Sequence, residues 1–202
     1  MSRRVDTLWV AALVSEVAPL VALLKRPRLV SHRLCVGELD GRTVAVLRCG
    51  VGPERARRRT QEALSLVEAA QVWSLGSCGA LMDDLAVGDV ITADRVLYGQ
   101  QVMRVSPVAD VRSGAVLTVD APIFTAQRRQ AVAHLGAAVC EMEAASVVAC
   151  HRDVRVLKVV SDRAGAEPDV VFDGARAIAV ARFHLRVERL MRTRLLPVLR
   201  GA

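Results

Sequence analysis

The stretch AAVCEMEAA (residues 137–145) places two carboxylates and a thioether where an apolar strand is expected to turn into a helix. Polar side chains at the carboxyl end of a strand in an α/β sheet face the crevice where ligands bind, whereas a structural helix start needs only one short capping side chain. A Glu in the first helical turn is also favoured by the helix dipole, with or without a ligand. The stretch alone therefore fits a ligand site and an ordinary helix start equally well.

Four further strand ends repeat this pattern along the chain. They occur at Glu16, Gly50, Ser77 and Asp162, each after an apolar run. Apolar runs that alternate with helical spacing predict an α/β fold. Sheets of this kind gather the carboxyl ends of their strands on one edge, so we expect residues far apart in the sequence to line a single pocket.

Hydrophobic periodicity and turn residues give approximate bounds for the elements. Asp40-Gly41 is a strong hairpin signal, and residues 106–113 are the least regular segment, a predicted loop near the pocket mouth. Thr125 is expected to cap a helix. The predicted helices cover 17–24, 54–70, 125–135, 142–151 and 173–199, and the predicted strands 8–14, 34–39, 43–49, 72–75, 87–91, 95–98, 116–119, 137–140 and 154–160.

The composition predicts one domain over residues 1–202 with an aliphatic core. The chain is 52% hydrophobic but only 3% aromatic, so its core must be built from Val, Leu and Ala. Its five cysteines are scattered without a CxxC pair, which predicts reduced, mostly buried thiols in a cytoplasmic protein. The apolar run at 8–14 is too short to span a membrane. We expect no metal and no cofactor.

The net charge of +7 comes almost entirely from arginines spread over the whole chain. The basic run in 55–59 falls in a helical pattern, where a solvated face is the ordinary outcome. So few aromatic residues give no stacking platform for single-stranded nucleic acid. Nucleic-acid binding is therefore not expected, and a basic membrane-surface module is a minor alternative.

Six segments resemble, in the right order, the signature segments of the nucleoside phosphorylase and nucleosidase superfamily. The resemblance covers nearly the whole chain and implies a three-layer α/β/α sandwich with a central mixed, mostly parallel sheet. It also implies cleavage of a nucleoside N-glycosidic bond by water or phosphate. The segments are Ser15-Glu16-Val17, Gly50-Val51-Gly52, Gly76-Ser77-Cys78-Gly79-Ala80, Val87-Gly88-Asp89-Val90, Glu141-Met142-Glu143-Ala144 and Ser161-Asp162.

The resemblance implies a role for each matching residue. Asp162, with Ser161 beside it, would protonate N7 of a purine, and general acid catalysis of this kind commonly supplies ~10²- to 10⁴-fold. Glu143 would accept the ribose 2′- and 3′-hydroxyls, where a carboxylate binds more tightly as positive charge develops on the sugar. Met142 would form the apolar floor under the sugar, and Glu141 would help to shape the turn.

The remaining matches bear on the nucleophile. Ser77 and Gly79 would lie near it, and Gly50 would let the backbone approach the ligand. Glu16 matches the base that activates water in methylthioadenosine/S-adenosylhomocysteine nucleosidases. Bacterial purine nucleoside phosphorylases carry a phosphate-gripping Arg where this chain has Ser74. Because a carboxylate is a poor neighbour for phosphate, hydrolysis is the expected reaction.

Two positions depart from the nucleosidase pattern. Pro122 stands where a Phe stacks on the base, and Gly165 stands where an acidic residue often follows the catalytic Asp. The Thr118-Val119-Asp120 segment, with Asp120 as a candidate substrate-binding residue, is more similar to hopanoid-associated nucleosidases, which are thought to act on adenosylhopane.

The predicted activity is therefore hydrolysis of a 5′-modified adenine nucleoside, such as adenosylhopane, methylthioadenosine or S-adenosylhomocysteine. A phosphorylase and a non-catalytic nucleoside-binding relative are the alternatives. A homodimer is expected, with peripheral membrane contact if the substrate is a lipid.

Overall fold

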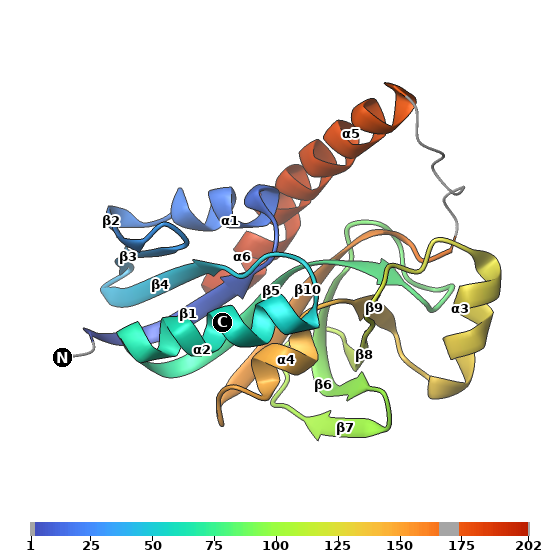
Figure 1. Cartoon of the computed structure of the whole chain (residues 1–202), viewed down its shortest axis with the longest axis horizontal. Coiled ribbons are helices and arrows are strands. Elements are labelled where there is room, and N and C mark those ends of the chain that lie inside the picture. The colour runs from blue at the N-terminus through green and yellow to red at the C-terminus, as the bar shows by residue number, and fades with distance from the viewer. Residues whose placement is uncertain (1–2, 166–173, 202) are drawn as a thin grey trace.

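The computed structural model describes residues 3–165 and 174–201, which form a ten-stranded sheet with helices packed against it (Figure 1). The strands are β1 (Arg3–Ala11), β2 (Lys25–Ser31), β3 (Leu34–Leu39), β4 (Arg42–Arg48), β5 (Val67–Ala80), β6 (Val90–Tyr98), β7 (Gln101–Arg104), β8 (Ser113–Thr118), β9 (Val139–Glu141) and β10 (Val154–Arg163). The helices are α1 (Val14–Val21), α2 (Pro53–Leu66), α3 (Ala126–Val132), α4 (Ala144–Val148), α5 (Gly174–Leu190) and α6 (Leu196–Gly201), with a 3₁₀ turn at Ala133–Leu135 and a π-helical stretch at Met191–Leu195.

The sheet is mixed, as predicted, but antiparallel pairs are as frequent in it as parallel ones. Its strand order is β10-β6-β8-β9-β5-β1-β4-β3-β2, with β7 beside β6. β5 also pairs with β10, so β5, β9, β8, β6 and β10 close into a ring. Parallel pairs join β1 to β4 and β5, β5 to β10, and β8 to β6 and β9, whereas the hairpins and the β5–β9 and β6–β10 pairs are antiparallel.

The helices cover both faces of the sheet, which gives the expected three layers (Figure 1). On one face, small residues such as Ala56 of α2 and Ala144 of α4 let these helices pack closely against the strands. On the other, Leu20 of α1 packs in a second cluster with Val187 of α5 and Leu199 of α6. Each face is aliphatic and buried, as the composition indicated.

Two local predictions are confirmed. Asp40 and Gly41 both have positive φ, 48° and 80°, which a tight two-residue hairpin between β3 and β4 requires. The Thr125 hydroxyl accepts a hydrogen bond from Arg128 N at the start of α3. The predicted C-terminal helix is continuous from Gly174, with the π-helical stretch inside it, and its predicted first residue, Asp173, lies outside the described residues.

Other boundaries were wrong. β1 ends at Ala11 and α1 begins at Val14, because Glu16 takes part in the first helical turn. The predicted helix 54–70 ends at Leu66, since β5 starts at Val67 to pair with Arg3 of β1. The predicted strands 87–91 and 95–98 form one strand, β6, with a register shift between Ala93 and Arg95. The helix predicted for 142–151 is limited to Ala144–Val148.

The prediction missed β2, an exposed edge strand. Its sequence KRPRLVS contains a proline and three cations, which are typical of edges rather than of buried strands. No helix within the described ranges is both long and apolar enough to cross a bilayer.

Candidate active site

A cavity of about 470 Å³ opens where the sheet meets the first turns of α1 and α4. The carboxyl ends of β1, β5, β9 and β10 contribute to its lining, so strand ends far apart in the sequence meet there. Hydrophobic side chains from the segment before α3 and from α5 complete the wall. The predicted site residues in the lining are Glu16, Ser77, Gly79, Glu141, Met142, Glu143, Ser161 and Asp162.

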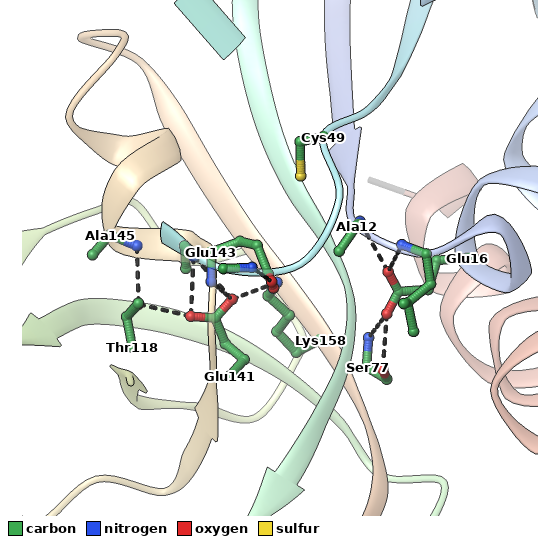
Figure 2. Close-up of polar contacts among 12 residues, drawn as sticks. Ala12, Glu16, Cys49, Ser77, Thr118, Glu141, Glu143, Ala145 and Lys158 are labelled. Carbon is green, nitrogen blue, oxygen red and sulfur yellow. Dashed lines mark hydrogen bonds and ion pairs between the residues drawn. The ribbon is translucent and has the colours of Figure 1, made fainter. Parts of the chain in front are cut away.

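Glu16 is buried and joins α1 to the end of β5 (Figure 2). One carboxylate oxygen accepts hydrogen bonds from the backbone N–H groups of Ala12 (3.0 Å) and Leu13 (2.9 Å). The other accepts from both the N–H and the hydroxyl of Ser77, each at 2.8 Å. Gly76 makes this approach possible, because a Cβ there would lie 2.8 Å from Glu16 Oε1. The Gly76-Ser77 pair near the end of β5 therefore makes room for the Glu16 carboxylate and supplies two of its donors.

Glu141 is the centre of a second buried network (Figure 2). Its carboxylate pairs with Lys158 Nζ at 2.9 Å and accepts a hydrogen bond from the Thr118 hydroxyl at 2.7 Å. It also accepts from the backbone N–H groups of Glu143 (3.0 Å) and Ala144 (2.9 Å) at the start of α4. These contacts use both carboxylate oxygens. Glu141 therefore lines the cavity but serves mainly to fix the backbone at Glu143 and Ala144.

Glu143 is buried, and its Oε1 accepts a hydrogen bond from Gly52 N at 2.8 Å, which ties α4 to the loop after β4. Burial, followed by the nearby charge of Glu141, raises the pKa of Glu143 to about 8, against the opposing effect of Lys158. Burial alone would lower the pKa of Lys158, but Glu141, Glu143 and Glu16 raise it above its ordinary value. Lys158 therefore stays charged beside Glu141, whereas Glu143 holds a proton more readily than an ordinary glutamate.

Asp162 stands beside Ser161 at the end of β10. Ser161 Oγ lies 2.5 Å from Asp162 Oδ1 and 3.2 Å from the Cys78 carbonyl oxygen. The Ser161 hydroxyl is thus the donor between two acceptors, and its shorter contact is to Asp162. Gly79 leaves room for this carboxyl group, since a Cβ there would lie 3.3 Å from Asp162 Oδ2.

Two candidate residues lie outside the lining. Val51 lines the cavity in place of Gly50, whose neighbour on the other side is the guanidinium of Arg59. Asp120 is exposed, and its Oδ1 accepts a hydrogen bond from the Tyr98 hydroxyl at 2.7 Å. Neither Gly50 nor Asp120 therefore lines the cavity.

The departures from the family pattern have a structural basis. Pro122 lines the cavity together with Phe124. Gly165 has φ 77°, and a Cβ there would lie 2.7 Å from the Thr125 carbonyl oxygen, so no acidic side chain fits. No residue of the predicted loop 106–113 lines the cavity, and Val108 within it is buried in the core.

The sequence reasoning missed Lys158 and Thr118. The available signal was a lysine inside the most apolar strand of a chain that has only two lysines, because a fully buried cation needs a carboxylate partner. With these two residues in place, the cavity presents the carboxyl groups of Asp162 and Glu143 and the hydrogen-bonded Glu16–Ser77 pair. Several carboxyl groups in one largely apolar cavity suit proton-transfer chemistry on a small molecule.

Comparison with known proteins agrees with this geometry. Residues 8–110 match the model of the phosphorylase superfamily. A 5′-methylthioadenosine/S-adenosylhomocysteine nucleosidase of Shewanella pealeana is 26% identical over 210 aligned residues, covering 81% of this chain and 89% of that protein.

Two solved structures share the fold over nearly their whole length. The nucleosidase of the same name from Neisseria meningitidis, in complex with methylthio-immucillin-A, has a TM-score of 0.81 at 18% identity and covers 98% of this chain and 99% of that one. Futalosine hydrolase of Helicobacter pylori has a TM-score of 0.78 at 16% identity and covers 100% of this chain and 99% of that one.

Proposed function

Because this chain belongs to the phosphorylase superfamily, we propose that it is a purine nucleosidase that hydrolyses the N-glycosidic bond of an adenine nucleoside modified at the 5′ position. The observation that carries the proposal is the meeting of Glu16, Ser77, Glu143 and Asp162 in one cavity of about 470 Å³. Curated relatives named as nucleosidases support it, over 81% of this chain in the case of the Shewanella pealeana protein.

Asp162 is the proposed acid. A purine leaves poorly as an anion, so a proton delivered to its ring lowers the barrier to bond cleavage. The Ser161 hydroxyl, which donates to Asp162 Oδ1, would hold this carboxyl group in place while it delivers its proton to the departing base. Gly79 keeps the space beside this carboxyl open.

Glu143 is the proposed ribose acceptor, above Met142 as the apolar floor. Its second oxygen is the group available to the sugar, since Oε1 is held by Gly52. With a pKa of about 8, Glu143 carries a proton in much of the unliganded protein at neutral pH, and two sugar hydroxyls would favour the ionised form. The sugar becomes positively charged in the transition state, so the ionised carboxylate is then most useful.

Glu16 and Ser77 are the proposed water-activating pair. The four donors that now surround Glu16 fill its lone pairs, so a water can bond to it only if one donor moves. The Ser77 hydroxyl can rotate away without any backbone change, whereas the three N–H groups cannot. The Glu16 carboxylate beside Ser77 would also repel a phosphate dianion, which supports water over phosphate.

The hydrophobic wall favours an apolar 5′ substituent. Val119, Pro122 and Phe124 form one side, and Val180 and Phe183 of α5 form the other. Phe124 and Val180 are each about half exposed, so the apolar surface continues to the mouth. We propose a methylthio-like or longer hydrocarbon group at this end, with adenosylhopane as one candidate, and membrane contact at the mouth if the substrate is that lipid.

A homodimer in the cytoplasm completes the proposal. Five free cysteines in the described residues suit a reducing compartment. Light scattering during size exclusion tests the dimer, and a mass of one chain would contradict it.

Chromatography of a nucleoside panel, with and without phosphate, tests the activity. The panel holds adenosine, inosine, methylthioadenosine, S-adenosylhomocysteine and a lipid-linked adenosine. We expect free adenine without added phosphate, loss of turnover in Asp162→Asn, and wild-type turnover in the exposed control Asp120→Asn. Strict phosphate dependence would instead select a phosphorylase, and tight binding without cleavage a non-catalytic relative.

A further inference from the structure

The strand that carries Asp162 is irregular at the residue before it. In the parallel pairing of β10 with β5, Val160 pairs with Cys78 and Asp162 with Gly79, so Ser161 is an extra residue on β10. Such a bulge bends its strand and changes the direction of the side chains that follow it. The carboxyl group of Asp162 therefore lines the cavity because of the bulge, not because of the regular alternation of the strand.

The extra residue of a bulge is not hydrogen-bonded in the ladder, so in a buried strand its backbone groups need other hydrogen-bond partners. Ser161 is 1% exposed, so water cannot serve its backbone. Its hydroxyl is held between Cys78 and Asp162, and its carbonyl oxygen accepts a hydrogen bond from Arg186 Nη1 at 3.3 Å. The Ser161 side chain is thus hydrogen-bonded within the sheet, and its carbonyl oxygen is hydrogen-bonded by a helix outside the sheet.

Arg186 reaches the bulge from α5, the helix that also forms one wall of the cavity. It stands three residues after Phe183, so the two share a helix face, and Phe183 lines the cavity. Arg186 is partly buried, whereas Arg182 and Arg189 on the same helix are exposed. Among these arginines of α5, Arg186 is thus the one set against the sheet.

We propose that Arg186 is a positioning residue that fixes the Ser161 bulge and so aims Asp162 into the cavity. The inference rests on the proposed function, in which Asp162 donates the proton. Without the guanidinium, the Ser161 carbonyl would lose its partner and the strand end would relax towards regular pairing. Asp162 would then remain present but misdirected, and a displacement of about 1 Å at a reacting group can lower a rate by ~10²-fold.

The test compares Arg186→Met, Arg186→Lys and the exposed control Arg182→Met with the wild type on the preferred nucleoside of the panel. In Arg186→Met we expect kcat to fall by ~10²-fold with KM within about twofold, because Glu143 and the apolar wall still bind the substrate. Arg186→Lys keeps a cationic donor and should recover part of kcat. Arg182→Met should match the wild type.

Hydrogen exchange gives a readout that does not depend on activity. The Ala164 N–H donates to the Ala80 carbonyl just after the bulge, at 3.0 Å, and reports whether the strand end is held. Faster exchange there in Arg186→Met, but not in Arg182→Met, is the expected result. Wild-type kcat and unchanged exchange in Arg186→Met would overturn the inference. A wild type that cleaves no nucleoside but shows the exchange difference would refute the nucleosidase proposal while leaving the role of Arg186 in the bulge.

Discussion

Lys158→Met is the substitution with the largest expected effect on stability. Methionine matches the length of the lysine stem but leaves Glu141, Glu143 and Glu16 without their buried cation. At the observed 2.9 Å, the Lys158–Glu141 attraction is ~6 kcal/mol for an effective dielectric of 20. Removal of one partner from a buried pair typically costs ~3–5 kcal/mol once relaxation is included, a large part of the ~5–15 kcal/mol that holds a domain together.

Urea unfolding at pH 7, followed by circular dichroism, measures this loss. Lys158→Met should lower the free energy of unfolding by ~3–5 kcal/mol. Glu141→Gln alone should also destabilise, because Lys158 is then only partly neutralised. The double variant Lys158→Met/Glu141→Gln should lose less than the sum of the two, with a coupling of at least ~1–2 kcal/mol. Additive losses, or a Lys158→Met variant as stable as the wild type, would show that the Lys158–Glu141 pair contributes little to stability.

Three further measurements probe the same site and its surroundings. Because the pKa of Glu143 is raised to about 8 in the folded state, stability should fall as pH rises from the ordinary range of a Glu through about 8, and the urea midpoint of Glu143→Gln should depend less on pH over that window. Gly76→Ala should destabilise by ~1–3 kcal/mol in thermal unfolding, more than Gly99→Ala, because both have positive φ but only the Cβ at Gly76 would meet Glu16. Thr125→Ala should cost ~1 kcal/mol through loss of the α3 cap, and an unchanged unfolding midpoint would show that this helix does not need it.

The strand-end residues of the site could be predicted because parallel strands place their carboxyl ends on one edge. Glu16, Ser77 and Asp162 each follow an apolar run, and this regularity is local in the sequence. Their separation in the chain does not matter once the strands pair. The same reasoning failed for Asp120, where the chain leaves β8 and turns towards Tyr98 instead of the cavity.

The roles of the two glutamates in the opening stretch could not be separated from sequence. Glu141 and Glu143 are two residues apart, and either could have faced a ligand. What distinguishes them is Lys158, which stands on a different strand and reaches Glu141 across the buried interior. Contacts of this kind depend on tertiary structure, not on local periodicity. The edge strand β2 was missed for a related reason, because its charges and proline carry no burial signal.

The ring of strands has a mechanical consequence for the cavity. Asp162 on β10 belongs to the ring, which has no free edge, and Glu143 directly follows β9 of the same ring. Glu16 instead follows β1, in the open half of the sheet that ends at β2. Partial opening should therefore begin at the β2 side, where the edge is exposed and the strand is irregular. In such an opened state, the proposed acid and sugar acceptor would keep their places while the proposed base is carried away with β1. On mild heating, catalysis would then be lost at a lower temperature than nucleoside binding, although all the proposed site residues lie in a single domain.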